Sequence, residues 1–227
     1  MRKLISFILL AVLGIGIVRP LKKIPFGTPK SKVGKYYVNN GVKDTGATNI
    51  VTSVVLNYRG FDTLGEVTVL FIAALGLGAV LTIRTGRKTK EKIEKASIVL
   101  STGCRFLFPF ILLIGAYIFI HGHLTPGGGF QGGAIIASAY LLVYLGCRGR
   151  RVSEKASSVV ESLAGLIFVI VGLIGLSVGG YFLLNFLPKG IPNSLFSAGI
   201  IPIIYVAIGF KVGSELAGVI DHLMEDT

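Results

Sequence analysis

Long apolar runs alternate with short polar segments along the whole chain. A helix that crosses the roughly 30 Å hydrocarbon core of a bilayer needs about 20 mostly apolar residues. Six stretches reach or approach this length, and their charge-free parts are residues 4–18, 67–83, 106–120, 130–147, 162–187 and 191–210. The pattern predicts an all-α, polytopic integral membrane protein with about six transmembrane helices.

Composition supports the same class. The 227 residues are 52% hydrophobic and 15% charged, with a mean hydropathy of +0.76, whereas soluble chains carry about 25% charged residues. A soluble enzyme is therefore excluded. The formal net charge of +12 comes from basic residues placed between apolar runs, which is typical of signals for membrane orientation rather than of contacts with nucleic acid.

Charge placement predicts a topology, because short loops rich in Lys and Arg tend to stay in the cytoplasm. The basic segments 84–105 and 148–155 then place both termini on the cytoplasmic side of the cell membrane. Segment 19–44 is also basic, yet it must lie on the external side of the membrane if the first helix crosses, which disagrees with the rule. The alternative is that the first helix lies differently in the membrane or that another segment also crosses it. No small-residue cleavage site follows the first apolar run, which favours an uncleaved helix over a signal peptide.

The charged stretch 84–95 suggests a boundary between a two-helix module, residues 1–95, and a four-helix module, residues 96–227. Both cysteines, Cys104 and Cys147, lie near predicted cytoplasmic helix ends. Two isolated cysteines give no metal framework, and a cytoplasmic setting disfavours a disulfide. We expect two free thiols.

The first block of polar residues follows the N-terminal region. Residues 49–58 predict a helix too short to span, which suits an interfacial or re-entrant position. Asp62 and Thr63 then stand where they can cap the second span. Glu66 lies one turn deeper, and an ionisable group inside a span usually faces a polar path or a partner. A proton- or cation-handling role competes with pairing to Arg59 or an interfacial position.

The second block, residues 121–133, reads HGHLTPGGGFQGG. His121 and His123 alone make an incomplete metal site, and the glycines lack the closing Lys-Ser/Thr of a phosphate loop. A tight external reversal explains the glycines, with Gly132 and Gly133 permitting close helix contact. The histidines could relay protons or anchor the loop to a partner.

The last span contains Lys211 and Glu215, which lie on one helix face because they are four residues apart. A static ion pair near the cytoplasmic end competes here with a proton relay. Glu161, at the predicted start of the fifth span, is expected at the membrane interface.

These blocks carry a resemblance to a known family. Residues 46–81, with NYRGFDTLGE at 57–66, resemble the C-terminal part of the A subunit of Mrp-type sodium/proton antiporters. The corresponding region of membrane-bound hydrogenases is a small separate subunit. Residues 104–145, with FPFILLIGAYIFIHGHLTPGGGFQGG, resemble the Mrp B subunit. The first 45 residues match only as a helix followed by a loop.

The resemblance implies a subunit of an ion-translocating complex, embedded in lipid with other Mrp-like membrane subunits. Because the tail is fused to a B-like module without the large antiporter body, it favours a respiratory complex with hydrogenase-like peripheral subunits over a free-standing antiporter. Fe–S clusters would then lie only in partner subunits, since this sequence has no ligation pattern for them. No catalytic site is expected in this chain.

Three hypotheses for function remain open. In the preferred one, Glu66 is the centre of a sodium or proton pathway, with oxygen ligands from Asp62, Asn49 and Thr52, since sodium is a hard ion that favours oxygen donors. Weaker candidates for a proton route are Lys211, Glu215, His121 and His123. A purely structural scaffold would use the glycines of the fifth span, Gly172, Gly175, Gly179 and Gly180, as a packing stripe. An independent transporter is disfavoured because no internal repeat is visible.

Overall fold

A computed structural model of the chain describes residues 2–23, 32–84, 96–146 and 153–225. Two compact units, Met1–Tyr36 and Tyr37–Thr227, are described separately. Across the described residues the regular structure is helical and contains no strand, which confirms the all-α prediction.

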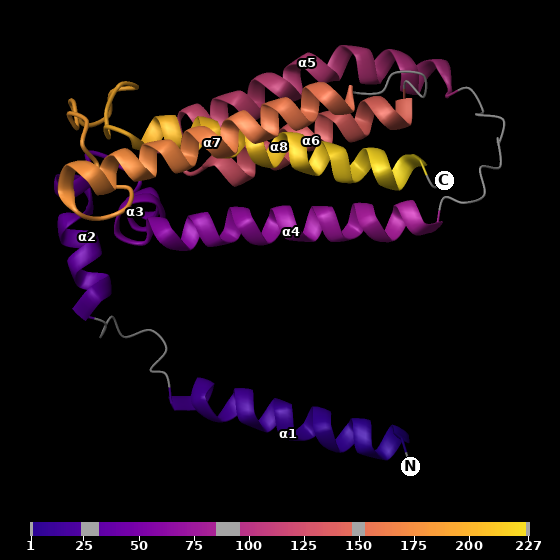
Figure 1. The fold of residues 1–227 in the computed structure, drawn as a ribbon, viewed down its shortest axis with the longest axis horizontal. Helices are drawn as coiled ribbons and strands as arrows, with labels where there is room; N and C mark the ends of the chain where they lie inside the picture. The colour runs from indigo at the N-terminus through magenta and orange to yellow at the C-terminus, as the bar shows by residue number, and fades with distance from the viewer. Residues whose placement is uncertain (1, 24–31, 85–95, 147–152, 226–227) are drawn as a thin grey trace. The chain divides into compact units, whose positions relative to one another are not determined.

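Six helices are long and apolar enough to cross a membrane, as predicted (Figure 1). They are α1 (Arg2–Lys23), α4 (Gly60–Arg84), α5 (Ile98–Ile120), α6 (Gly129–Gly146), α7 (Glu154–Gly179) and α8 (Ile201–Glu225). Shorter elements precede α4, namely α2 (Lys32–Thr45), α3 (Ile50–Ser53) and the π-helical turn η1 (Val54–Tyr58). The predicted short helix over residues 49–58 is therefore confirmed.

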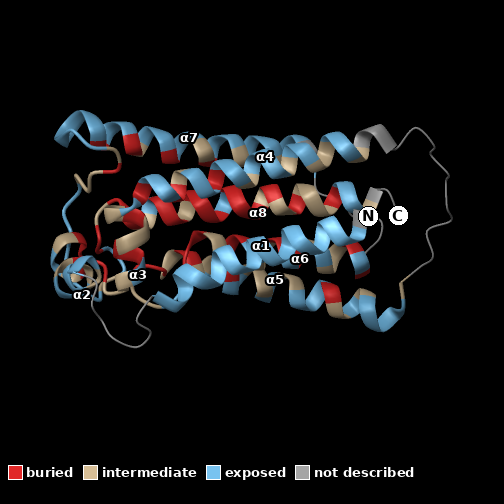
Figure 2. Cartoon of the chain, turned by 90° about the horizontal axis from the view of Figure 1, so that it is seen from below, coloured by how far each residue is buried: buried red, intermediate tan, exposed pale blue. Residues whose placement is uncertain are grey.

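Helix α8 forms the core of the larger unit. It packs against α4, α6 and α7 and more lightly against α5, and Figure 2 shows buried residues following its length. The apolar side chains of Ile201, Ile204, Ile208 and Val212 are almost completely buried there. The surrounding helices expose apolar outer faces, as spans in contact with lipid or other subunits do.

Helix α6 fits between α5 and α8 through glycines. A Cβ atom on Gly132 would lie 2.7 Å from the Gly115 carbonyl of α5, and one on Gly133 would lie 2.9 Å from the Gly209 carbonyl of α8. Neither position has room for a side chain, so the predicted close helix contact is confirmed.

The predicted junction between the fifth and sixth spans is wrong. Helix α7 ends at Gly179, and Gly180 adopts a left-handed conformation with φ of +81°, which favours glycine at the end of a helix. The chain then folds back, so that Gly175 meets the backbone of Leu184. Three glycines of the stripe expected for a scaffold, Gly172, Gly175 and Gly179, thus pack against this chain's own loop. Helix α8 begins only at Ile201.

Other predicted ends were also misplaced, because uncharged runs are poor guides to where helices end. Helix α8 continues beyond Lys211 to Glu225, and α7 begins before Glu161. Lys211 and Glu215 therefore lie in the middle of a span, and Glu161 lies inside one rather than at its start. Their mutual pairing, described below, allows charge at this depth.

The segment predicted as a loop after the first span contains α2 instead. Helix α4 also begins earlier than predicted, at Gly60, and α5 begins at Ile98 because the Ser97 side chain accepts a hydrogen bond from the Leu100 amide. Cys104 is buried and forms no disulfide with any described residue. Cys147, the proposed module boundary and most of the basic loop residues lie outside the described residues.

Candidate functional site

The two motif blocks, far apart in sequence, meet in space. The Asn49 side chain donates hydrogen bonds to the carbonyl groups of Gly122 and Thr125, each at 2.9 Å, while the Asn49 amide donates to the His123 carbonyl at 3.1 Å. Asn49 also caps α3 by accepting from the Val51 amide. The first block therefore holds the loop of the second block by its backbone.

Thr52 extends this contact to the core helix. Its hydroxyl donates to the Gly122 carbonyl at 2.7 Å and lies 2.8 Å from the Tyr205 hydroxyl. Position 122 has no room for a side chain, because a Cβ atom there would lie 2.8 Å from the Tyr205 ring. Residue spacing gave no indication of Tyr205, which joins the two motifs to α8.

His123 belongs to the same loop and is completely buried. Neither ring nitrogen has a hydrogen-bond partner within the described structure. Burial lowers the pKa of His123 below its ordinary value, because the charged ring would lose its hydration. Nearby backbone groups of Ser194 and Leu195 oppose this effect, and His121 adds to it. Burial therefore favours the neutral form of the His123 ring.

His121 has different surroundings. Its ring stacks on Tyr117 with centroids 4.1 Å apart, and its Nδ1 lies 3.0 Å from the Tyr117 carbonyl. The two histidines thus have separate environments. Within the described ranges, no three His, Cys, Asp or Glu residues are grouped as a metal site would require.

Asp62 and Glu66 lie on α4, apart from this contact. Asp62 forms an ion pair with Arg59 in the first turn, while Thr63 donates to the Val55 carbonyl at 2.6 Å. Glu66 is exposed on the surface of the chain, and no ion pair or hydrogen bond of its side chain occurs among the described residues. Arg59 pairs with Asp62 and not with Glu66, contrary to the alternative prediction.

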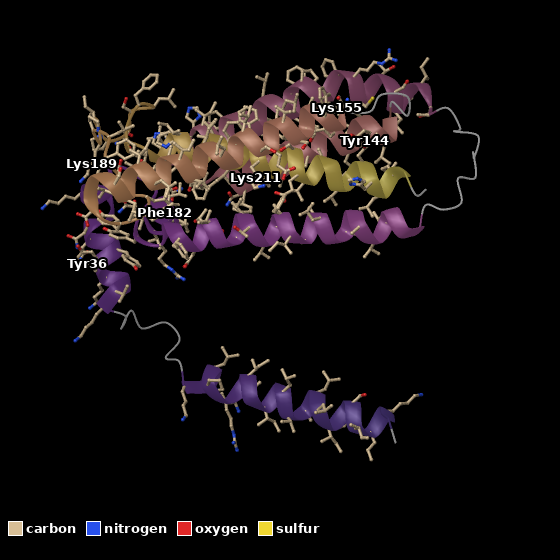
Figure 3. All side chains as sticks on the ribbon, viewed as in Figure 1. Tyr36, Tyr144, Lys155, Phe182, Lys189 and Lys211 are labelled. Atoms are coloured by element: carbon tan, nitrogen blue, oxygen red, sulfur yellow. The ribbon has the colours of Figure 1, made fainter. Side chains whose placement is uncertain are left out.

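A second polar group lies halfway along α8, where Figure 3 labels Lys211. The Lys211 ammonium is 3.2 Å from a carboxylate oxygen of Glu161 on α7 and 3.5 Å from one of Glu215. It also lies 4.7 Å from the centre of the Phe71 ring of α4. Lys211 therefore joins three helices, and sequence spacing predicted only its partner on the same helix.

Comparison with known proteins identifies the family. Residues 99–218, more than half of the chain, match the family described as a domain related to the MnhB subunit of Na⁺/H⁺ antiporters. The chain belongs to this family. Residues 1–98 match a second family, MbhE, which is described as a subunit of MBH. The predicted resemblance to Mrp-type antiporter subunits is confirmed.

Solved structures and a curated relative extend the family likeness. The chain is 49% identical to a chain in the structure of the membrane-bound sulfane sulfur reductase, an archaeal respiratory membrane complex, with a TM-score of 0.83 and 98% of both chains covered. It is 30% identical to a chain of the Mrp complex from Dietzia sp. DQ12-45-1b, with a TM-score of 0.77, covering 98% of this chain and 26% of that one. An uncharacterized protein of Methanocaldococcus jannaschii is 33% identical over 74% of each chain.

Proposed function

We propose that this chain is a membrane subunit of a respiratory complex that couples redox chemistry to the movement of sodium ions and protons. The observation that carries this proposal is the 49% identity over almost the whole of both chains with a subunit of a respiratory membrane complex. Family membership supports the movement of sodium ions and protons, since one of the two matching families is related to a subunit of Na⁺/H⁺ antiporters. The two matches together cover residues 1–218.

The proposed partners follow from what this chain lacks. Other Mrp-like membrane subunits would supply the antiporter body, and hydrogenase-like peripheral subunits would carry the Fe–S clusters. The sequence has two cysteines, fewer than the four that most Fe–S clusters use. The basic segments between spans favour cytoplasmic termini.

Glu66 is the proposed ion-handling group in the first part of the chain. It lies about 9 Å along α4 from the first residue of the helix and is exposed at the surface of the isolated chain. A carboxylate is too costly to leave in lipid, so it needs a polar path or a partner subunit. We infer that Glu66 faces a neighbouring subunit, where it binds a proton or a sodium ion together with Asp62.

Asn49 and Thr52 would contribute to such a path mainly by holding the histidine loop in place. Both side chains donate hydrogen bonds to carbonyl groups of the histidine loop, although their oxygens stay candidates for sodium ligands. His121, His123, Lys211 and Glu215 are the proposed groups of a separate proton route.

Glu66→Gln tests the proposal in membrane vesicles that contain the native complex. The substitution keeps the shape of the side chain and removes its charge, so sodium-dependent proton movement should be lost while the complex still assembles. Val69→Ala is the matched control, because Val69 lies one turn further along on the same exposed face of α4. Undiminished sodium coupling in Glu66→Gln would reject the role of Glu66. Equal losses of assembled complex in both variants would instead indicate a structural scaffold.

A free-standing Mrp antiporter is the second candidate function. It is favoured by the 30% identity to a chain of an Mrp complex, over 98% of this chain. In that case ion gradients alone would drive transport, and no redox subunits would be required.

A further inference from the structure

A cavity of about 490 Å³ lies between α4, α7 and α8, with Tyr144 of α6 at one wall. Figure 3 shows Lys211 at mid-length of the bundle and Tyr144 nearer the end where the C-terminus lies. Glu215 and Asp221 both line the cavity, and they are separated along α8 by about 9 Å. The cavity therefore reaches from the middle of the helix towards its C-terminal end.

Buried carboxylate oxygens that line this space have no hydrogen-bond partner among the described residues. The Glu215 side chain is only 2% exposed, and no described residue donates a hydrogen bond to either of its oxygens. The same holds for Oδ1 of Asp221. Native proteins rarely leave buried polar atoms unsatisfied unless water, an ion or a proton supplies the missing bond. A cavity of this volume has room for several water molecules.

The charges around the cavity do not balance. Glu161, Glu215 and Asp221 line it, and a single ammonium, that of Lys211, is shared between Glu161 and Glu215. His222 is a further titratable group in the lining, Tyr144 is contributed by α6, and α4 contributes only apolar residues and glycine. Three carboxylates beside one lysine inside a span are costly unless protons or cations reduce the negative charge.

We propose that this cavity is a water-filled proton-exchange site in which Glu215 takes up and releases a proton. Lys211 pairs more closely with Glu161 when Glu215 is protonated, and it pairs with both carboxylates when Glu215 is ionised. Asp221 and His222, nearer the end of α8, pass the proton between Glu215 and the aqueous phase. This inference names the site of the proposed proton route. It rests on one part of the proposed function, namely that the complex moves protons.

A proton fits this site better than a metal ion. The described residues hold no convergent set of three His, Cys, Asp or Glu, whereas a proton needs only one acceptor at a time and water between acceptors. The occupant is therefore expected to be a proton, without a requirement for sodium.

Infrared difference spectroscopy of the purified native complex tests the site directly. A protonated carboxyl group has a distinct carbonyl band that shifts in D₂O, and this band should appear as pH is lowered. We expect one such band to be lost in Glu215→Gln and retained in Glu66→Gln. An identical set of bands in the wild type and Glu215→Gln would overturn the proposal. Loss of the band when sodium replaces potassium would also overturn it, because sodium would then be the occupant.

A cavity-filling variant keeps the test valid even if Glu215→Gln fails to assemble. Gly218 lines the cavity, and a Cβ atom there would meet nothing within 4 Å. Gly218→Val should slow exchange of the carboxyl proton into D₂O, whereas Gly76→Val, at an equally open position of α4 outside the lining, should not. Equal exchange in both variants would contradict a water-filled route. Since neither readout measures transport by Glu66, failure here is distinguishable from failure of the proposed function.

Discussion

Individual polar residues in this chain have two kinds of surroundings. Asn49 and Thr52 donate hydrogen bonds to backbone carbonyl groups of the loop after α5, so a structural role accounts for their side-chain donors. Glu66 and Glu215 are different, because their carboxylate oxygens accept no hydrogen bond from the described part of the chain. An unsatisfied carboxylate in a span is the stronger indication of ion handling.

His123 makes the loop between α5 and α6 sensitive to pH. Burial lowers the pKa of His123 in the folded protein, so the unfolded loop binds a proton more readily. The contribution of His123 to the stability of the folded loop is therefore fully present above the ordinary histidine pKa of about 6.5. It is lost as pH falls from that value to the lower pKa of the folded state. Hydrogen exchange of the loop, residues 121–128, should lose protection on acidification.

Comparison of variants at each pH removes the intrinsic pH dependence of exchange. His123→Gln cannot titrate and should abolish the loss of protection, whereas His121→Gln, at the less buried ring stacked on Tyr117, should retain it. The same acid-induced loss in His123→Gln would show that another group is responsible.

At the scale of helices, glycine decides how closely the bundle packs. Helix α6 approaches α5 through Gly132 and α8 through Gly133, with no room for a Cβ atom on either side. Without a hydrophobic driving force between helices in lipid, such close contact is a main source of association. Not every glycine in the spans has this constraint, because a Cβ atom on Gly218 would meet nothing within 4 Å.

Gly133→Ala should therefore destabilise the chain. The added methyl group would lie 2.8 Å from Val212 Cβ and 2.9 Å from the Gly209 carbonyl, and overpacking of this kind costs about 1–3 kcal/mol. Gly218→Ala is the control, because it adds the same methyl group in open space and gains helix propensity of up to about 1 kcal/mol. Thermal unfolding of the two variants in detergent should separate them, and equal midpoints would contradict the packing argument.

For the molecule as a whole, exposed apolar surface implies coverage by lipid and by other subunits. The span of α4 has few buried residues within the larger unit. Together with an exposed Glu66, this indicates that the chain functions inside a larger membrane assembly.

Mild-detergent purification of the native complex should therefore recover partner subunits. We expect mass spectrometry to identify Mrp-like membrane subunits together with peripheral Fe–S subunits. Recovery of antiporter-type membrane subunits alone would favour a free-standing antiporter, and solute uptake by the purified single chain would contradict both functions.

The sequence alone determined the membrane class, the six spans and the family, because all three depend on apolar runs and on long local motifs. It also determined the short helix before α4 and the close packing of Gly132 and Gly133. Helix ends were less predictable, since Lys211 marks no boundary when it pairs with Glu161 on another helix and with Glu215 on its own. Only the tertiary structure decided that Asn49 binds the histidine loop and that carboxylates of α7 and α8 line one cavity. Such contacts join residues 50 or more positions apart, and no local pattern encodes which distant residues become neighbours.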